Sequence, residues 1–267
     1  MKKLISMILA LVVPLSFFGC GGGGGENVKT YKKYFTLSFD DGTTEDEKLI
    51  ALLRKYDIPA TFCLNTGLMN GEVSIEAGGS WRRTDFDYAK SNRIYEGFDV
   101  ISHAYTHKEF LKLGADEIAE QTEKDCEKIK ELTGVSPKGL AYPGGTAYYD
   151  DRVISVLLAD TEVRFARDTD DMYEFYLPTN FMAWKPTCSI LDNRLTALAQ
   201  KFVEAEADED LLFYVWDHPW AVSAYNAWGK VEEFLKYMSG REDIVYLTNS
   251  EFYELFKDEI PSKGLWD

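Results

Sequence analysis

The chain has 267 residues, of which 45% are hydrophobic, so it is long and apolar enough to bury one substantial core. Its formal net charge of −16 makes the surface repel phosphate backbones, which argues against nucleic-acid binding. Besides Cys20 the chain has three widely spaced cysteines, and they form no metal-binding pair. The sequence leaves two alternatives open: one disulfide among Cys63, Cys126 and Cys188, or buried free thiols.

The N-terminus has the pattern of an export signal. Two lysines precede an apolar run (4–18) that is too short to span a bilayer, and a small residue precedes Cys20. This pattern predicts lipidation of Cys20, with simple secretion or an uncleaved anchor as alternatives. The glycines at 21–25 predict a flexible tether. We expect a lipoprotein-type signal peptide at 1–19, a tether at 20–32, and an exported protein anchored by lipid in the bacterial cell envelope.

Strand-like and helix-like segments alternate after the tether. Short apolar runs predict strands at 34–39, 60–64, 98–101, 139–142, 163–166, 211–216 and 244–247. Helical spacing predicts helices at 45–56, 116–132, 150–158, 191–203, 228–238 and 250–256, and Gly134 stands at a C-cap position. This alternation implies parallel pairing. We predict an α/β fold, a distorted (β/α) barrel of about seven parallel strands, in one domain at 33–257 with a tail at 258–267.

The residues with chemical potential follow the predicted strands. Asp40 and Asp41 follow the first strand, His103 the third and His218 the sixth, and a Pro-Gly-Gly turn begins at Pro143 after the fourth. In (β/α) barrels, active sites form at the C-terminal ends of the strands. We therefore expect these residues to meet at one end of the barrel.

Two of the three histidines are spaced for metal binding. His103 and His107 are four residues apart, which brings two rings to one side of a helical turn or tight loop. Taken alone, that spacing also fits ordinary histidines, and the Asp41-Gly42 pair also fits an ordinary turn. Two imidazoles with one carboxylate, however, are the ligand set of a catalytic zinc site with an open position.

Four segments together resemble the polysaccharide deacetylases, the family 4 carbohydrate esterases. LSFDDG at 37–42 is similar to the first motif of that family and SHAYTH at 102–107 to the second. AYPGG at 141–145 resembles a variant of the third, and WDH at 216–218 resembles the late histidine motif. Their order and spacing match as well, over roughly residues 33–257.

The resemblance implies a role for each matching residue. Asp41, His103 and His107 would hold a divalent metal, which we expect to be Zn²⁺, with Co²⁺ or Ni²⁺ as alternatives. Asp40 would be the general base that activates water, and His218 the general acid that protonates the leaving group.

The third motif implies the oxyanion and substrate contacts. The backbone N–H of Gly144 matches the donor that stabilises the oxyanion in the family. We expect Tyr142 and Pro143 to bind substrate beside it. The family has Tyr or Phe in place of Gly144, so the missing ring should widen the floor of the groove.

One expected residue is missing from the third motif. The family carries an Arg two residues before the proline, where it orients the catalytic aspartate, and this chain has Ala141. We predict that Arg167, at the end of the next strand, replaces it. The alternative is a surface arginine paired with Asp168 or Asp170.

The long connection 65–96 leaves the second strand at the catalytic end, so it could form a rim over a groove. Trp81 in this connection either stacks on a sugar or packs beneath the loop. Trp220, two residues after His218, is the best-placed aromatic residue for substrate binding, and Trp184 and Trp228 are further candidates.

These features favour a metal-dependent hydrolase that removes N- or O-linked acetyl groups from a cell-wall or extracellular polysaccharide. Two alternatives stay open. The first is an amidohydrolase that acts on a non-sugar amide with the same metal site. The second is a catalytically inactive, lipid-anchored carbohydrate-binding protein, which would fit the change at Ala141. The sequence does not define an oligomeric state.

Overall fold

Parallel strands form the centre of the fold. The protein is described here by a computed structural model that covers residues 31–70, 73–76, 79–206 and 208–266. The expected signal peptide, Cys20 and most of the tether lie outside these residues. Within them, no helix is both long and apolar enough to cross a membrane.

The main sheet has the strand order β7-β6-β5-β2-β1-β9-β8, and β10 also pairs with β1. All of its pairs are parallel. Its strands are β1 (Lys33–Asp40), β2 (Thr61–Leu64), β5 (Asp99–Ser102), β6 (Gly139–Ala141), β7 (Phe165–Arg167), β8 (Cys188–Ser189), β9 (Leu211–Asp217) and β10 (Ile244–Tyr246). The predicted α/β class and distorted (β/α) barrel are therefore confirmed, with two-residue β8 added to the seven predicted strands.

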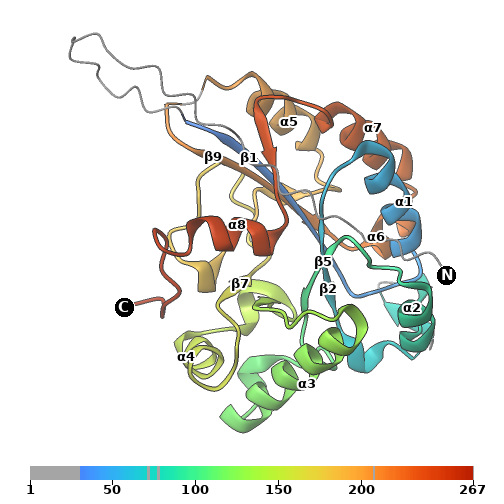
Figure 1. Ribbon diagram of the computed structural model, residues 1–267, viewed down its shortest axis with the longest axis vertical. Coiled ribbons are helices and arrows are strands. Elements are labelled where there is room, and N and C mark those ends of the chain that lie inside the picture. Colours follow the sequence, from blue (N-terminus) through green and yellow to red (C-terminus); the bar gives the residue numbers. More distant parts are fainter. Residues whose placement is uncertain (1–30, 71–72, 77–78, 207, 267) are drawn as a thin grey trace, which may run out of the picture. The chain divides into compact units, whose positions relative to one another are not determined.

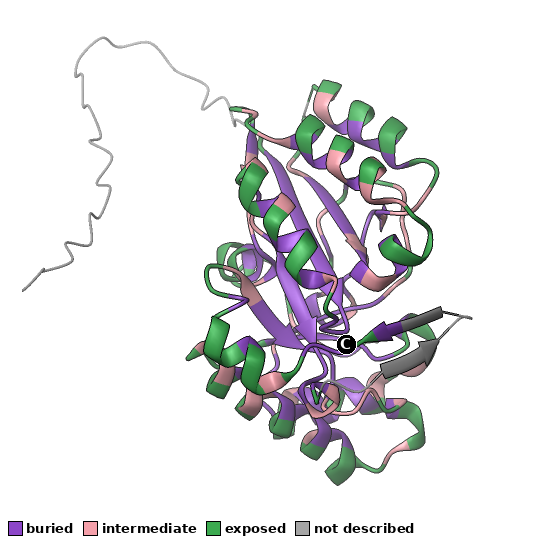
Figure 2. Ribbon diagram, turned by 90° about the vertical axis from the view of Figure 1, so that its right-hand side faces the viewer, coloured by how far each residue is buried: buried purple, intermediate pink, exposed green. Residues whose placement is uncertain are grey.

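Helices flank this sheet and turn their buried faces toward it (Figures 1 and 2). They are α1 (Asp46–Tyr56), α2 (Phe86–Asn92), α3 (Ala115–Thr133), α4 (Asp151–Asp160), α5 (Leu195–Glu204), α6 (Pro219–Ala224), α7 (Trp228–Met238) and α8 (Asn249–Phe256). The short α2 and α6 were not predicted. The predicted start of α5 at residue 191 was too early, because the chain first makes two tight turns, in which the N–H of Asp192 bonds to the carbonyl of Ser189 (3.1 Å) and that of Leu195 to the carbonyl of Asp192 (3.2 Å).

Strand β1 lies at the heart of the sheet. Its first half pairs with β10 and β9, and its second half with β2 and β9. All eight of its residues are buried, as expected for a parallel strand covered on both faces. The strand therefore carries Asp40 and Asp41 into the interior on a fully supported backbone.

The long connection 65–96 contains an antiparallel hairpin, β3 (Val73–Glu76) and β4 (Gly79–Arg82), as well as α2. Beyond β4 the chain continues alongside the turn that follows β1. Thr44 N–H donates to the carbonyl of Arg82 (3.0 Å), and Thr84 N–H to that of Gly42 (2.9 Å). The connection thus reaches the segment that begins at Asp41.

The remaining cysteines are free thiols. Cys63 and Cys188 are buried, and Cys126 is partly buried. Burial raises the pKa of each thiol, so none is poised to react as a thiolate. Of the two alternatives left open by the sequence, the structure has the free thiols.

Gly134 caps α3 in the left-handed region, at φ +84°, and its N–H bonds to the carbonyl of Lys130 (2.8 Å). An added Cβ would meet no atom within 4 Å, so a substitution changes only the backbone energy. We expect Gly134→Ala to lower the free energy of unfolding by about 1–2 kcal/mol. Gly229→Ala, equally uncrowded in the first turn of α7, should instead raise it, by at most about 0.5 kcal/mol. Urea denaturation of both variants measures this; equal signs would contradict it.

Candidate functional site

The chemically suggestive residues gather at the C-terminal ends of the strands. Asp40 ends β1, Arg167 ends β7, and His218 directly follows β9. His103 directly follows β5. Parallel pairing of these strands brings residues that are far apart in sequence into one site, where the rule for (β/α) barrels places it.

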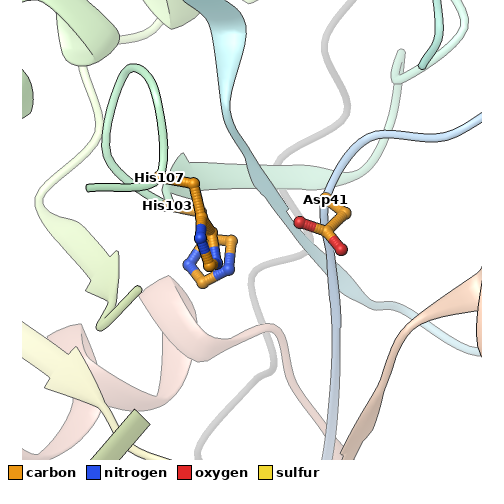
Figure 3. Close-up of side chains that lie close together, drawn as sticks. All are labelled: Asp41, His103 and His107. Atoms are coloured by element: carbon orange, nitrogen blue, oxygen red, sulfur yellow. The ribbon is translucent and has the colours of Figure 1, made fainter. Parts of the chain in front are cut away.

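Asp41, His103 and His107 are the one group of three metal-ligating side chains close enough to hold an ion among the described residues. One ligand atom from each lies within 4.8 Å of the other two. The carboxylate of Asp41 points toward the two imidazole rings, which come from a separate loop (Figure 3). The rings of His103 and His107 lie edge to face with centroids 4.7 Å apart. The predicted ligand set is therefore together in space.

The ring of His103 is oriented for ligation through one nitrogen. Its Nδ1 lies 2.8 Å from the carbonyl oxygen of Ala141, which fixes Nδ1 as the donor. That tautomer leaves Nε2 with a free lone pair, the arrangement typical of metal-bound histidines. Two imidazoles and a carboxylate suit a borderline divalent ion, and the protein supplies three ligands. The donor set therefore fits a divalent metal with an open coordination position.

Arg167 contacts the carboxylate of Asp40. Its Nη2 donates to both carboxylate oxygens, with 2.6 Å to Oδ2, and both side chains are at most 2% exposed. The guanidinium also lies over the Trp216 ring, 4.7 Å from its centroid. Toward Asp168, Arg167 donates only to the backbone carbonyl (3.2 Å). Arg167 is therefore not a surface arginine paired with Asp168 or Asp170. It contacts Asp40, the carboxylate that an arginine at position 141 would orient in the family.

His218 faces both aspartates from β9. Its Nε2 is 3.9 Å from Asp40 Oδ2 and 3.8 Å from Asp41 Oδ2, and its Nδ1 is 3.6 Å from Asp217 Oδ1. Burial by itself lowers the pKa of His218, but Asp217 and the two aspartates outweigh it and raise this pKa to about 9. The imidazole is therefore protonated at neutral pH.

For Asp40, Asp41 and His103, the surroundings instead lower the pKa and so favour the deprotonated form. Burial raises the pKa of Asp40, but Arg167 and the nearby histidines outweigh it and hold this pKa below its ordinary value. His218 and Arg83 do the same for the pKa of Asp41. Burial lowers the pKa of His103 to about 4 against the attraction of the aspartates. Two carboxylates, a neutral histidine and a protonated one therefore share the site.

Trp220 contacts Asp41, one of the candidate metal ligands. Its Nε1 donates to Asp41 Oδ2 (2.7 Å), and its ring stacks on Trp81 with centroids 4.1 Å apart. Trp81 is only 7% exposed, so of the two interpretations the packed tryptophan is the one observed. Trp184 is fully buried in the core, which excludes it from a rim. Trp228 bonds to Ser223 Oγ on the neighbouring helix α6.

The third motif differs from its expected role at two residues, Tyr142 and Gly144. Tyr142 is 1% exposed and donates to the carbonyl of Met182 (2.9 Å), so its ring does not face substrate. Gly144 is exposed, at φ +79°, but a Cβ there would lie 2.2 Å from the ring of Tyr148. The expectation of a widened floor is wrong at this position, because Tyr148 occupies the space. Pro143 is buried beside them.

Three residues at the site were not predicted. Asp217 contacts His218, Arg83 forms a buried ion pair with Asp41 (2.9 Å), and Asn65 bonds to the carbonyl oxygens of His103 and Ala104. Asp217 adjoins His218 in sequence and could have been proposed on that ground. Nothing in the sequence pattern connects Arg83 with Asp41, since the contact depends on the path of the hairpin.

Solved structures share the fold. The Xyl-CE4 domain of a multidomain xylanase from the hindgut metagenome of Trinervitermes trinervoides aligns with a TM-score of 0.54 at 18% identity, over 88% of this chain and 95% of that one. BA3943 from Bacillus anthracis, a CE4 family pseudoenzyme, aligns with a TM-score of 0.51 at 18% identity, over 82% and 65%. At such identities the likeness concerns the fold.

Curated relatives match part of the chain. The uncharacterized protein YlxY of Bacillus subtilis (strain 168) is 32% identical over 112 residues, 42% of this chain and 31% of that protein. A bifunctional xylanase/deacetylase of Pseudobutyrivibrio xylanivorans is 26% identical over 137 residues, 50% of this chain and 21% of that protein. The matches span about a third or less of the length of these relatives.

The family itself follows from a broader match. The sequence model of the polysaccharide deacetylase family matches residues 27–164, just over half of the chain. That span contains both aspartates, both histidines of the second motif and the variant third motif. Arg167 and His218 lie beyond it, at the ends of strands β7 and β9, which bring them to the same site. The chain belongs to the polysaccharide deacetylase family.

Proposed function

We propose that this protein is a metal-dependent hydrolase that removes N- or O-linked acetyl groups from a polysaccharide. The observation that carries the proposal is the contact of Arg167 with both oxygens of Asp40. Ala141 removes the arginine expected in the third motif, and Arg167 supplies a guanidinium to the same carboxylate from the next strand. A base, an acid and a set of metal ligands are therefore all present.

Each group has a task that its surroundings support. Asp40, ionised and held by Arg167, accepts a proton from the attacking water. His218, protonated and 3.9 Å from Asp40, donates a proton to the leaving amine or alcohol. A divalent metal bound by Asp41, His103 and His107 would polarise the acetyl carbonyl and lower the pKa of water. The backbone N–H of Gly144 is the matching candidate for the oxyanion donor.

We propose Zn²⁺ as the metal, because two imidazoles and a carboxylate are a common catalytic zinc set. The substrate would be an acetylated glycan of the cell wall or extracellular space. Export and lipid anchoring at Cys20 remain part of the proposal on the strength of the N-terminal sequence alone. An anchored enzyme of this kind would act on polymers close to the membrane surface.

The test combines metal content with acetate release. We expect the purified protein to hold one equivalent of zinc and to release acetate from at least one member of a panel of peptidoglycan, chitin oligomers and acetylated xylan. Chelation should abolish release, and zinc should restore it. Metal binding with hydrolysis of small amides, but of no acetylated sugar, would instead favour an amidohydrolase with a non-sugar substrate.

A catalytically inactive carbohydrate-binding protein is the second candidate, because the change at Ala141 removes a family residue. Such a protein would bind a glycan of the panel and release no acetate even when loaded with metal. The contact of Arg167 with Asp40 weighs against it, since a protein that only binds sugar has no use for an oriented base.

A further inference from the structure

The metal ligands stand on two separate loops whose backbones are strained. Asp41 has φ +87° and His107 φ +54°, and Ala104 between the two histidines has φ +62°. Residues other than glycine rarely adopt this left-handed region, and such conformations persist only where surrounding contacts hold them. Contacts from outside these residues must therefore hold the backbone of each loop.

Arg83 holds the Asp41 loop from two sides. Its Nη1 donates to the backbone carbonyl of Asp41 (2.5 Å) and lies 2.9 Å from Asp41 Oδ1. It is 4% exposed, and its backbone forms an antiparallel bridge with Thr43 in the turn that follows β1. One nitrogen thus fixes both the left-handed backbone and the carboxylate of a metal ligand.

Asn65 holds the histidine loop and meets Arg83. Its Nδ2 donates to the carbonyl oxygens of His103 and Ala104, the latter at 2.9 Å, and its Oδ1 accepts from Arg83 Nη1 at 3.4 Å. Asn65 is fully buried. A continuous buried path therefore runs from Asp41 through Arg83 and Asn65 to the backbone beside His103.

We infer that Arg83 and Asn65 are positioning residues that set the distance between Asp41 and the two histidines, and so the affinity of the metal site. The inference rests on the metal site of the proposed function and assigns it a supporting pair on the connection 65–96. Neither side chain touches substrate in this role. Contacts that orient metal ligands typically change affinity by about 10- to 100-fold.

Zinc titration of the variants tests this inference. We expect Arg83→Met and Asn65→Ala each to weaken Zn²⁺ binding by about 10- to 100-fold. The double variant should bind no more weakly than the worse single variant, because both changes break the same path. Arg83→Lys should recover part of the affinity, since the contacts of Arg83 with Asp41 and Asn65 lie at Nη1 and an ammonium group can donate there.

The readout separates positioning from general stability. For each variant, the rise in Tm on addition of zinc is compared with its own metal-free protein, so a loss of stability common to both states cancels. Arg164→Met is the control, because the Nη1 of Arg164, like that of Arg83, donates to backbone carbonyls (those of Thr161 and Val163), but Arg164 precedes β7 at the strand end opposite to the site. It should bind zinc like the wild type.

The outcomes distinguish the two proposals. Absence of zinc binding by the wild type would refute the metal site itself. Zinc binding by the wild type that is lost in Asp41→Asn but unchanged in Arg83→Met and Asn65→Ala would refute only the positioning pair. Tighter binding by Arg83→Met would also overturn it, because repulsion between the guanidinium and the metal would then dominate. If Arg83→Met does not fold, Asn65→Ala and Arg83→Lys decide.

Discussion

Replacing Arg167 with alanine is expected to lower kcat for acetate release by about 10²- to 10⁴-fold, the range typical of a general base. Arg167 is the buried cation whose Nη2 contacts both oxygens of Asp40. Without it, the pKa of Asp40 rises, because burial is then opposed only by the nearby histidines. The acidic limb of the pH–rate profile should therefore move to higher pH, which a profile of kcat/KM measures.

The same change should also destabilise the fold. Removing one partner of a buried ion pair costs about 3–5 kcal/mol, because the other charge stays buried and unpaired. The double variant Asp40→Asn/Arg167→Met is the control: it should regain much of that stability and remain inactive. Wild-type kcat in a folded Arg167→Ala protein would show that Arg167 does not orient the base.

Asp41→Asn and Asp40→Asn should separate metal binding from turnover. Asp41→Asn is expected to weaken zinc binding by more than about 100-fold, because changes that merely support a ligand already cost about 10- to 100-fold. Asparagine suits this test, since it is nearly isosteric and tolerates the left-handed backbone of residue 41. Asp40→Asn should keep the metal and lose turnover by about 10²- to 10⁴-fold.

Elemental analysis and isothermal titration measure the metal, and acetate release measures turnover. Unchanged zinc affinity in Asp41→Asn would show that the ligand assignment is wrong. Loss of metal in Asp40→Asn would show that the two aspartates do not have separate tasks. Each variant removes the carboxylate that pairs with a buried arginine, Arg83 or Arg167. The thermal unfolding of each should therefore be compared with that of the wild type, to show that the variant is folded.

The sequence was most informative where burial alone determines structure. The run at 34–39 is apolar and β-branched or aromatic at most positions, and it forms β1 at the centre of the sheet. Once strands alternate with helices, parallel pairing places their C-terminal ends together. This reasoning brought Arg167 next to the site, although no spacing rule could have defined its contact with Asp40.

The sequence analysis did not predict several short elements and one long-range contact. The hairpin β3–β4 was missed although Val73–Glu76 alternates apolar and polar residues and two glycines follow it, and β8 has only two residues. Helix α6 begins at Pro219, a residue favoured at the first helical position, so that start was available as a signal. The bond between Arg83 and Asp41 joins residues 42 apart in sequence through the hairpin. Only the folded path of the chain reveals it.

The stacked pair of Trp81 and Trp220 gives the site an optical probe. The Trp220 indole donates to Asp41 Oδ2, and the two rings lie nearly parallel with an interplanar angle of 16°. Parallel indoles at this separation couple their electronic transitions, so the pair should contribute a distinctive circular dichroism band. A metal ion bound by the Asp41 carboxylate would weaken the hydrogen bond that the indole N–H of Trp220 donates to it, and so would change the fluorescence of Trp220. We therefore expect metal binding to change the tryptophan fluorescence of the protein.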